Sequence, residues 1–182
     1  SKGLGVFTFN DFKIDLYDKY TNEFKYILPL IVSRGDISYK LIAVWTKKVE
    51  DKKKNHINYI RQLHFALKEY ESFIDDENVI IAGDFNMDRR MDDNPTGTKF
   101  ALKDTYPTNN FFDAILDMGF HDCMRKFNSE PIQTHRNPKS KFPWELDHMF
   151  ATDDLYKRLK EITVPEVSNL SDHDPIVAHF DF

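Results

Sequence analysis

A short, fully apolar segment at residues 79–82 (Val-Ile-Ile-Ala) is followed at once by a polar string, Gly-Asp-Phe-Asn, at residues 83–86. A strand in which every residue is apolar must be covered on both faces, so the segment predicts a central strand of a packed sheet. The chain therefore has to place helices or a second sheet on each side of this strand. The acid Asp84 and the amide Asn86 then stand where the strand gives way to a loop.

The remaining strands and helices are predicted from periodicity and turn residues. Strands are expected at residues 3–9, 26–32, 39–45 and 145–151, with two more closing the chain. Helices are expected at residues 52–74, at residues 108–119 with Thr108 as the N-cap and Gly119 at the end, and near residues 153–159. The Arg-Gly-Asp triplet at residues 34–36 is interpreted as a hairpin turn. Together these elements predict a single α/β domain of the α+β kind over residues 1–182.

Charge and cysteine content restrict the class of protein. The formal net charge of −5 disfavours a protein that binds nucleic acid mainly by neutralising phosphates, although it leaves room for a local basic patch. The lysines at residues 47–48 and 52–54 are interpreted as a solvated helix entrance, with a phosphate-steering patch as the alternative. Cys123 is the single cysteine, which excludes an internal disulfide and a cysteine-based zinc site. No apolar run is long enough to span a bilayer and no signal peptide is visible, so a cytoplasmic location is expected.

Two further strings carry candidate catalytic side chains. Residues 146–150 read Leu-Asp-His-Met-Phe and place Asp147 at the start of a strand, while residues 171–175 read Ser-Asp-His-Asp-Pro. Taken alone, residues 83–86 are equally compatible with a strand followed by an Asx turn. Residues 171–175 are equally compatible with a loop capped by such turns. No one of these strings therefore indicates a catalytic site by itself, and the three are considered together.

These residue types suit phosphodiester hydrolysis, which requires an activated water and neutralisation of the phosphoryl oxygens. In extended chain, Asp84 and Asn86 point to the same side and can face one substrate as an anion and an amide donor. A histidine that acts as a general base is best held by a carboxylate, and Asp147 is a suitable partner for His173.

In this order along the chain, the three strings resemble the endonuclease/exonuclease/phosphatase superfamily of DNase I-like, metal-dependent phosphoesterases. The resemblance implies a DNase I-like four-layer αββα sandwich of two mainly antiparallel sheets. It implies that Asp84 positions or activates the water, that Asn86 contacts the phosphate, and that Asp147 pairs with His173. It also implies that Asp172 is a metal ligand and that the cofactor is Mg²⁺ or Mn²⁺.

Three further residues are expected to bind substrate. Trp144 stands where the apurinic endonucleases, as the resemblance implies, place an aromatic residue against the substrate. His135, in the loop ahead of Trp144, is either a substrate contact or ordinary loop polarity. Many relatives place a phosphate-holding His or Tyr near the position of Thr46, which can donate a hydrogen bond but cannot protonate a leaving group.

The chain departs from the family pattern at its N-terminus. Complete members begin with a strand carrying an Asn and a second strand carrying a metal-binding Glu, and neither lies ahead of Gly3. We therefore expect an N-terminally truncated domain. The sequence predicts a metal-dependent phosphodiester hydrolase that acts on nucleic acid or a small phosphoester, with no obligate protein partner. A catalytically incomplete member that serves as a binding module is the alternative.

Overall fold

The computed structural model describes residues 3–47, 59–75, 77–92, 111–139 and 142–182. It contains one six-stranded sheet, with strand order β1-β2-β3-β4-β6-β5, and one two-stranded sheet, β7-β8. The strands are β1 (Lys13–Leu16), β2 (Ile27–Arg34), β3 (Ile37–Trp45), β4 (Val79–Asp84), β5 (Phe120–Asp122), β6 (Asp147–Thr152), β7 (Leu159–Thr163) and β8 (Val177–Phe180). Only the β3–β4 pair is parallel among these strands, so both sheets are mainly antiparallel, as predicted.

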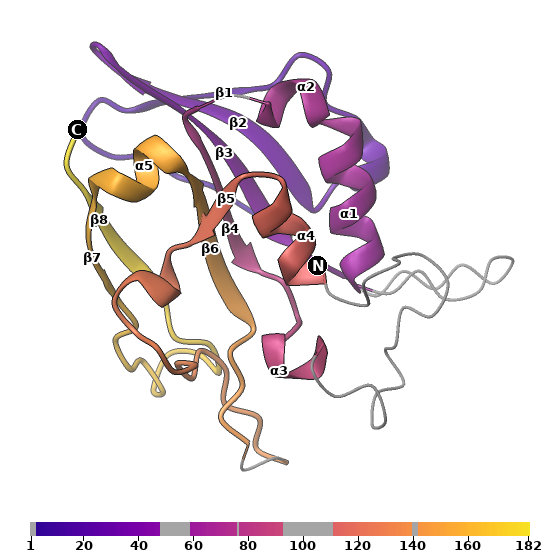
Figure 1. The fold of residues 1–182 in the computed structure, drawn as a ribbon, viewed down its shortest axis with the longest axis vertical. Helices are drawn as coiled ribbons and strands as arrows, with labels where there is room; N and C mark the ends of the chain where they lie inside the picture. Colours follow the sequence, from indigo (N-terminus) through magenta and orange to yellow (C-terminus); the bar gives the residue numbers. More distant parts are fainter. Residues whose placement is uncertain (1–2, 48–58, 76, 93–110, 140–141) are drawn as a thin grey trace, which may run out of the picture.

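Helices and the small sheet cover opposite faces of the large sheet (Figure 1). The helices are α1 (Tyr59–Glu69), α2 (Glu71–Ile74), α3 (Arg89–Asp92), α4 (Phe111–Asp117) and α5 (Asp153–Arg158). One core lies under α1, α2 and α4, and a second lies between the large sheet and the segment formed by α5, β7 and β8. This arrangement confirms the predicted α/β fold with two sheets. In the described part of the chain, no helix is both long and apolar enough to cross a membrane.

Strand β4 lies at the centre of the large sheet, as its apolar sequence predicted. It pairs in parallel with β3 and antiparallel with β6. Val79 and Ile81 are buried in the core under the helices, whereas Ile80 is buried in the core on the other face. Successive side chains of a strand point to opposite faces, so burial on both faces requires an uninterrupted apolar run.

Gly83 lets β3 and β4 approach closely just before the polar residues begin. Its φ is +138°, and a Cβ atom built there would lie 2.0 Å from the carbonyl oxygen of Val44. Any larger residue would push the two strands apart at the end that carries Asp84. The glycine of the Gly-Asp-Phe-Asn string is therefore a packing requirement.

Several predicted elements differ from the structure. Residues 3–9 form no strand, because the segment makes no ladder hydrogen bonds to a neighbouring strand, and the first strand is β1, at Lys13–Leu16. The short strand β5 was missed, since three residues carry too little periodicity to be recognised. The long predicted helix divides at Tyr70 into α1 and α2. Strand β6 begins at Asp147, two residues later than expected.

Other predictions agree or lie outside the described residues. Gly35 has φ +56° in the turn between β2 and β3, which confirms the hairpin turn expected from the Arg-Gly-Asp triplet. Gly119 follows α4 with φ +88°, as expected for a residue just beyond a helix. The N-cap predicted at Thr108 lies outside the described residues. The single-domain assignment over residues 1–182 and the N-terminal truncation stay predictions.

Candidate active site

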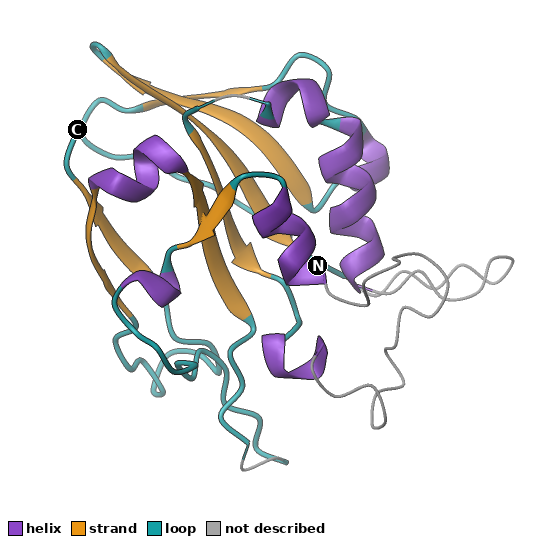
Figure 2. Ribbon diagram, viewed as in Figure 1, coloured by secondary structure: helices purple, strands orange, loops and turns teal. Residues whose placement is uncertain are grey.

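Asp84, Asp147 and His173 come together at one end of the large sheet. Asp84 is the last residue of β4, Asp147 is the first residue of β6, and the two are direct partners in the antiparallel register. His173 reaches them from the loop that precedes β8. One potential ligand atom from each of the three residues lies within 4.8 Å of the other two. Loops surround this end of the sheet (Figure 2).

His173 is held by Asp147. The Nδ1 atom of the imidazole lies 2.8 Å from Oδ2 of Asp147, and the backbone N–H of His173 donates to Ser171 Oγ at 3.0 Å. The hydrogen bond to Asp147 is the largest cause of a raised His173 pKa. Desolvation acts in the opposite direction, and the negative charges of Asp147 and Asp84 add to the rise. Because Nδ1 is engaged by the carboxylate, Nε2 is the ring nitrogen left to face a substrate.

Asp84 has a strongly perturbed pKa. The pKa of this carboxyl is raised from 3.8 to about 6, with burial as the largest cause and the neighbouring charge of Asp147 as the next. Hydrogen bonds from Asn86 and the positive charge of His173 offset part of the rise. A carboxyl with a pKa near neutrality can accept and return a proton at physiological pH, which is the property required of a general base.

Asn86 fixes the orientation of Asp84. Its backbone N–H donates to Asp84 Oδ1 at 2.8 Å, and its side-chain Nδ2 donates to Asp84 Oδ2 at 2.9 Å. The same Nδ2 donates to the carbonyl oxygen of Thr46 at 3.0 Å, and Asn86 adopts φ +50°. The Asx turn considered as an alternative for this string is therefore formed. It holds the Asp84 carboxylate in place, so the turn and the functional interpretation are compatible.

The hydroxyl of Thr46 is buried and already bonded. Its side chain is 1% exposed and its hydroxyl donates to the carbonyl oxygen of Phe85. Its backbone N–H donates to the carbonyl oxygen of Asp84 at 2.9 Å. The phosphate contact at Thr46 stays a prediction, and it would require the buried hydroxyl to exchange its present hydrogen bond. In this structure Thr46 supports the backbone around Asp84 and Asn86.

His135 and Trp144 lie beside the catalytic residues. The rings of His135 and His173 are 4.5 Å apart between centroids, and isolated backbone bridges join His135 to both Trp144 and His173. Trp144 is partly exposed and packs its ring against Phe142 at 4.3 Å. The Nδ1 atom of His135 is buried without a hydrogen-bond partner. Their substrate contacts stay predictions, but their position next to His173 is compatible with that role.

Asp172 is not one of the three clustered residues, although its negative charge contributes to the raised pKa of His173. Its side chain is exposed, and its carbonyl oxygen accepts from the backbone N–H of Arg136 at 2.8 Å. Among the described residues, the group able to hold a metal ion consists of Asp84, Asp147 and His173 only. The metal-ligand role of Asp172, implied by the family resemblance, therefore stays a prediction.

Two supporting residues were not singled out from the sequence. Thr134 is fully buried, and its hydroxyl accepts from the backbone N–H groups of Leu146 at 2.9 Å and Asp147 at 3.0 Å. Its carbonyl oxygen accepts from the N–H of Asp174 at 2.8 Å. A loop threonine carries no sequence signal, because its role depends on two strings that lie more than ten residues away. Asp174 was visible in its string, and its buried carboxylate accepts from the N–H of Val167 at 2.8 Å.

The donor set fits a hard divalent cation. Two carboxylates and an imidazole lie within reach of one another, and carboxylate oxygens are the ligands that Mg²⁺ and Mn²⁺ prefer. The mutual repulsion of Asp84 and Asp147, which contributes to the raised Asp84 pKa, would be relieved by a cation between them. Asp84 and Asp147 are thus the residues that would hold the ion.

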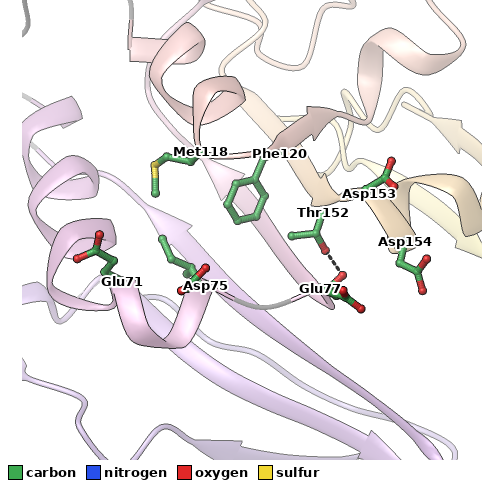
Figure 3. Close-up of a pocket in the computed structure, with 10 residues that line it drawn as sticks. Glu71, Asp75, Glu77, Met118, Phe120, Thr152, Asp153 and Asp154 are labelled. Carbon is green, nitrogen blue, oxygen red and sulfur yellow. Dashed lines mark hydrogen bonds between the residues drawn. The ribbon is translucent and has the colours of Figure 1, made fainter.

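Two cavities differ in their relation to these residues. One, of about 650 Å³, is a largely apolar groove that includes Asp147, His173 and Gly83 in its wall. The other, of about 510 Å³, lies at the opposite end of the sheet, between Glu77 and Phe120 (Figure 3). Its wall is rich in carboxylates, but it contains none of the predicted site residues. The groove beside His173 is therefore the cavity relevant to the predicted chemistry.

Comparison with known proteins places most of the chain within one protein family. A model described as the Endonuclease/Exonuclease/phosphatase family matches residues 18–173. No curated protein matches the chain at a significant level.

Solved structures with the same fold include three nucleases. An AP endonuclease from Archaeoglobus fulgidus is 21% identical with a TM-score of 0.64, and the match covers 94% of this chain and 71% of that one. The 3'-5' exonuclease NExo from Neisseria meningitidis is 18% identical with a TM-score of 0.61, over 94% and 71% of the two chains. The endonuclease domain of TRAS1, a telomere-specific non-LTR retrotransposon, is 17% identical with a TM-score of 0.60, over 93% and 67%. At these identities the likeness establishes the fold.

Proposed function

The chain belongs to the endonuclease/exonuclease/phosphatase family, and on that basis we propose that it is a divalent-metal-dependent phosphodiester hydrolase that acts on nucleic acid. The observation that carries the proposal is the meeting of Asp84, Asp147 and His173 within 4.8 Å. The structural relative NExo, as a 3' phosphatase, is known with a product DNA hairpin bound, which favours nucleic acid as the substrate class. The cytoplasmic location and the lack of an obligate protein partner stay predictions.

The residues of this chain divide the chemistry between them. His173, held through Nδ1 by Asp147, presents Nε2 to the substrate and exchanges a proton there. Asp84, held in place by Asn86, orients the attacking water and accepts its proton. When bound, Mg²⁺ or Mn²⁺ would neutralise charge on the phosphoryl oxygens.

Asn86 acts first as a positioning residue. Its amide already donates to Asp84 and to the carbonyl oxygen of Thr46. A direct contact between Asn86 and the phosphate, as the family resemblance implies, therefore requires one of these bonds to be exchanged. We infer that loss of the Asn86 amide would misplace the Asp84 carboxylate as well as weaken phosphate binding.

The test is hydrolysis of a fluorescent oligonucleotide and of bis(p-nitrophenyl) phosphate with Mg²⁺, with Mn²⁺ and with EDTA. We expect metal-dependent turnover that falls by about 10²- to 10⁴-fold in His173→Ala and in Asp84→Asn, the range that a general acid or base contributes. His121→Ala is the matched control, since His121 is a partly exposed histidine that pairs with Asp153 away from the site.

The binding-module alternative gives a different result. A folded chain that binds the oligonucleotide but shows no turnover with either metal, and that binds equally well as Asp84→Asn, would contradict the proposed hydrolase. Equal turnover in the parent and in His173→Ala would contradict the assigned role of the histidine.

A further inference from the structure

Four residues follow one another across the large sheet at the end that carries the candidate active site. Asp147 pairs with Asp84, and Asp84 pairs with Trp45. The backbone N–H of Trp45 donates to the carbonyl oxygen of Tyr26 at 2.9 Å, directly beyond the first residue pair of β2 and β3. Because neighbouring strands lie about 4.8 Å apart, Trp45 is one strand away from Asp84 and Tyr26 is two strands away.

These four side chains point to the same face of the sheet. Val44 is buried under the helices, so the next residue, Trp45, points to the opposite face, where Asp84 and Asp147 meet His173. Residues that are paired across strands share a face. The row therefore runs from two carboxylates to two aromatic rings along one surface.

The aromatic half of the row carries positive charge. The rings of Tyr26 and Trp45 meet edge to face with centroids 5.2 Å apart, and both residues are partly exposed. Nζ of Lys47 lies 4.8 Å from the centroid of each ring, and Nζ of Lys25 lies 5.1 Å from that of Tyr26. Desolvation raises the pKa of the Tyr26 phenol, but the two lysine ammonium groups outweigh desolvation and lower the pKa.

The backbone of Lys47 is held in place, in addition to the contacts of its ammonium group with the two rings. Its backbone N–H donates to Oε1 of Gln62 on α1 at 3.3 Å, which fixes the chain where it leaves β3. One lysine over one ring is common on protein surfaces. Two lysines converging on a pair of rings in register with catalytic carboxylates form a more specific arrangement.

We propose that Trp45 and Tyr26, with Lys47 and Lys25, form a subsite that stacks a nucleobase and holds the phosphate beside it, next to the phosphodiester bond that is cleaved. Aromatic rings stack on any base, and lysines on the same surface neutralise the adjacent backbone. A phosphoester without a base would occupy only the carboxylate half of the row. The inference rests on the proposed function for the position of the bond that is cleaved, and it makes single-stranded or unpaired nucleic acid the substrate class.

Binding without turnover tests the subsite independently of catalysis. In a Trp144→Phe background, Trp45 is the single tryptophan and its fluorescence reports on the rings directly. With EDTA present, the protein is titrated with octathymidylate and with an octamer of abasic tetrahydrofuran nucleotides of equal charge. We expect the base-bearing octamer to bind about 5- to 150-fold more tightly than the abasic one, the range that stacking of one base supplies, and to quench Trp45.

Variants separate stacking from charge. In Trp45→Ala, binding is followed by the anisotropy of labelled octamers, and the preference for bases should be lost. Trp45→Phe keeps an aromatic ring and should retain most of the preference, which shows that the loss in Trp45→Ala is not a folding defect. Lys47→Ala should weaken both octamers to the same extent and lower the salt dependence of binding. Lys160→Ala, on β7, is the matched control for loss of one exposed lysine and should change neither.

The outcomes distinguish this inference from the proposed function. Equal binding of the two octamers by the parent protein, or a preference that survives in Trp45→Ala, would overturn the subsite. If the parent shows the preference and the same preference persists in Asp84→Asn, while no variant or metal gives hydrolysis, the subsite stands and the hydrolase proposal fails.

Discussion

Nδ1 of His173 lies 2.8 Å from Oδ2 of Asp147, although the two residues are 26 positions apart, one at the start of β6 and the other in the loop before β8. Thr134 supports the backbone on both sides of the pair. Its hydroxyl accepts from the N–H of Asp147, and its carbonyl oxygen accepts from the N–H of Asp174. One buried loop residue thus fixes both strings that supply the pair. This arrangement gives the imidazole a defined orientation before any substrate is present.

The first prediction concerns the pKa of His173. Because the hydrogen bond to Asp147 is the largest cause of its elevation, Asp147→Asn should lower this pKa, since desolvation then acts with less opposition. The measurement is an NMR pH titration of the histidine ring protons in EDTA. Asp154→Asn, which removes an exposed acid far from the histidine, should leave it unchanged. An unaltered pKa in Asp147→Asn would show that the pair does not form in solution.

Asp88 should be important for stability. Its buried carboxylate accepts from the backbone N–H of Glu145 at 2.8 Å and from Nε of Arg90 at 2.7 Å. Burial raises its pKa, but the hydrogen bonds and charge of Arg90 and the N–H of Glu145 outweigh burial and lower it. Asp88→Asn should lower the free energy of unfolding by about 2–4 kcal/mol at pH 7. This is less than the ~5 kcal/mol that can be lost when a fully buried ion pair is broken, because Arg90 is partly exposed.

The pH dependence of that loss has a defined sign. A lowered pKa in the folded state gives stability that is present above the ordinary value of 3.8 and is lost as the pH falls through the folded value. Urea unfolding should therefore show a large difference between the parent and Asp88→Asn at pH 7 and a smaller one at pH 3. A difference that grows toward acid would contradict the assigned hydrogen bonds.

Two glycines provide a matched comparison of backbone requirements. In Gly83→Ala, the new Cβ would lie 2.0 Å from the carbonyl oxygen of Val44, so the strands must separate, and we expect a loss of more than about 3 kcal/mol. In Gly35→Ala, φ is +56° but no atom lies within 4 Å of the new Cβ, so the cost should be about 1–2 kcal/mol. Thermal unfolding of both variants measures the contrast, and equal losses would rule out the close approach at Gly83.

Cys123 should be inert in the folded protein. The thiol is fully buried, and burial, followed by the charge of Asp122, raises its pKa to about 12. The reactive thiolate is therefore scarce and inaccessible at neutral pH. Ellman's reagent should label no thiol in native protein and one thiol per chain in guanidinium chloride, with Cys123→Ala as the blank. Rapid labelling of native protein would show that the core around Cys123 opens.

The amino-acid sequence by itself determined the central strand and the candidate residues. The apolar run at residues 79–82 admits no exposed face, which is why β4 could be placed in the middle of a sheet. Asp84, Asp147 and His173 were identifiable because acids and an imidazole directly beside apolar strands cost desolvation energy that only function or a turn explains. The resemblance to the family rested on the same short strings.

Only the tertiary structure decided how these strings meet. The Asp84–Asp147 pairing depends on the register between β4 and β6, which are separated by more than sixty residues, and local sequence carries no information on such a register. Local sequence could not predict the burial of Thr46, the exposure of Asp172 or the support from Thr134. These features depend on contacts between residues that are distant in sequence. The row from Asp147 to Tyr26 likewise exists only because four strands align, and alignment across a sheet is a property of the folded chain.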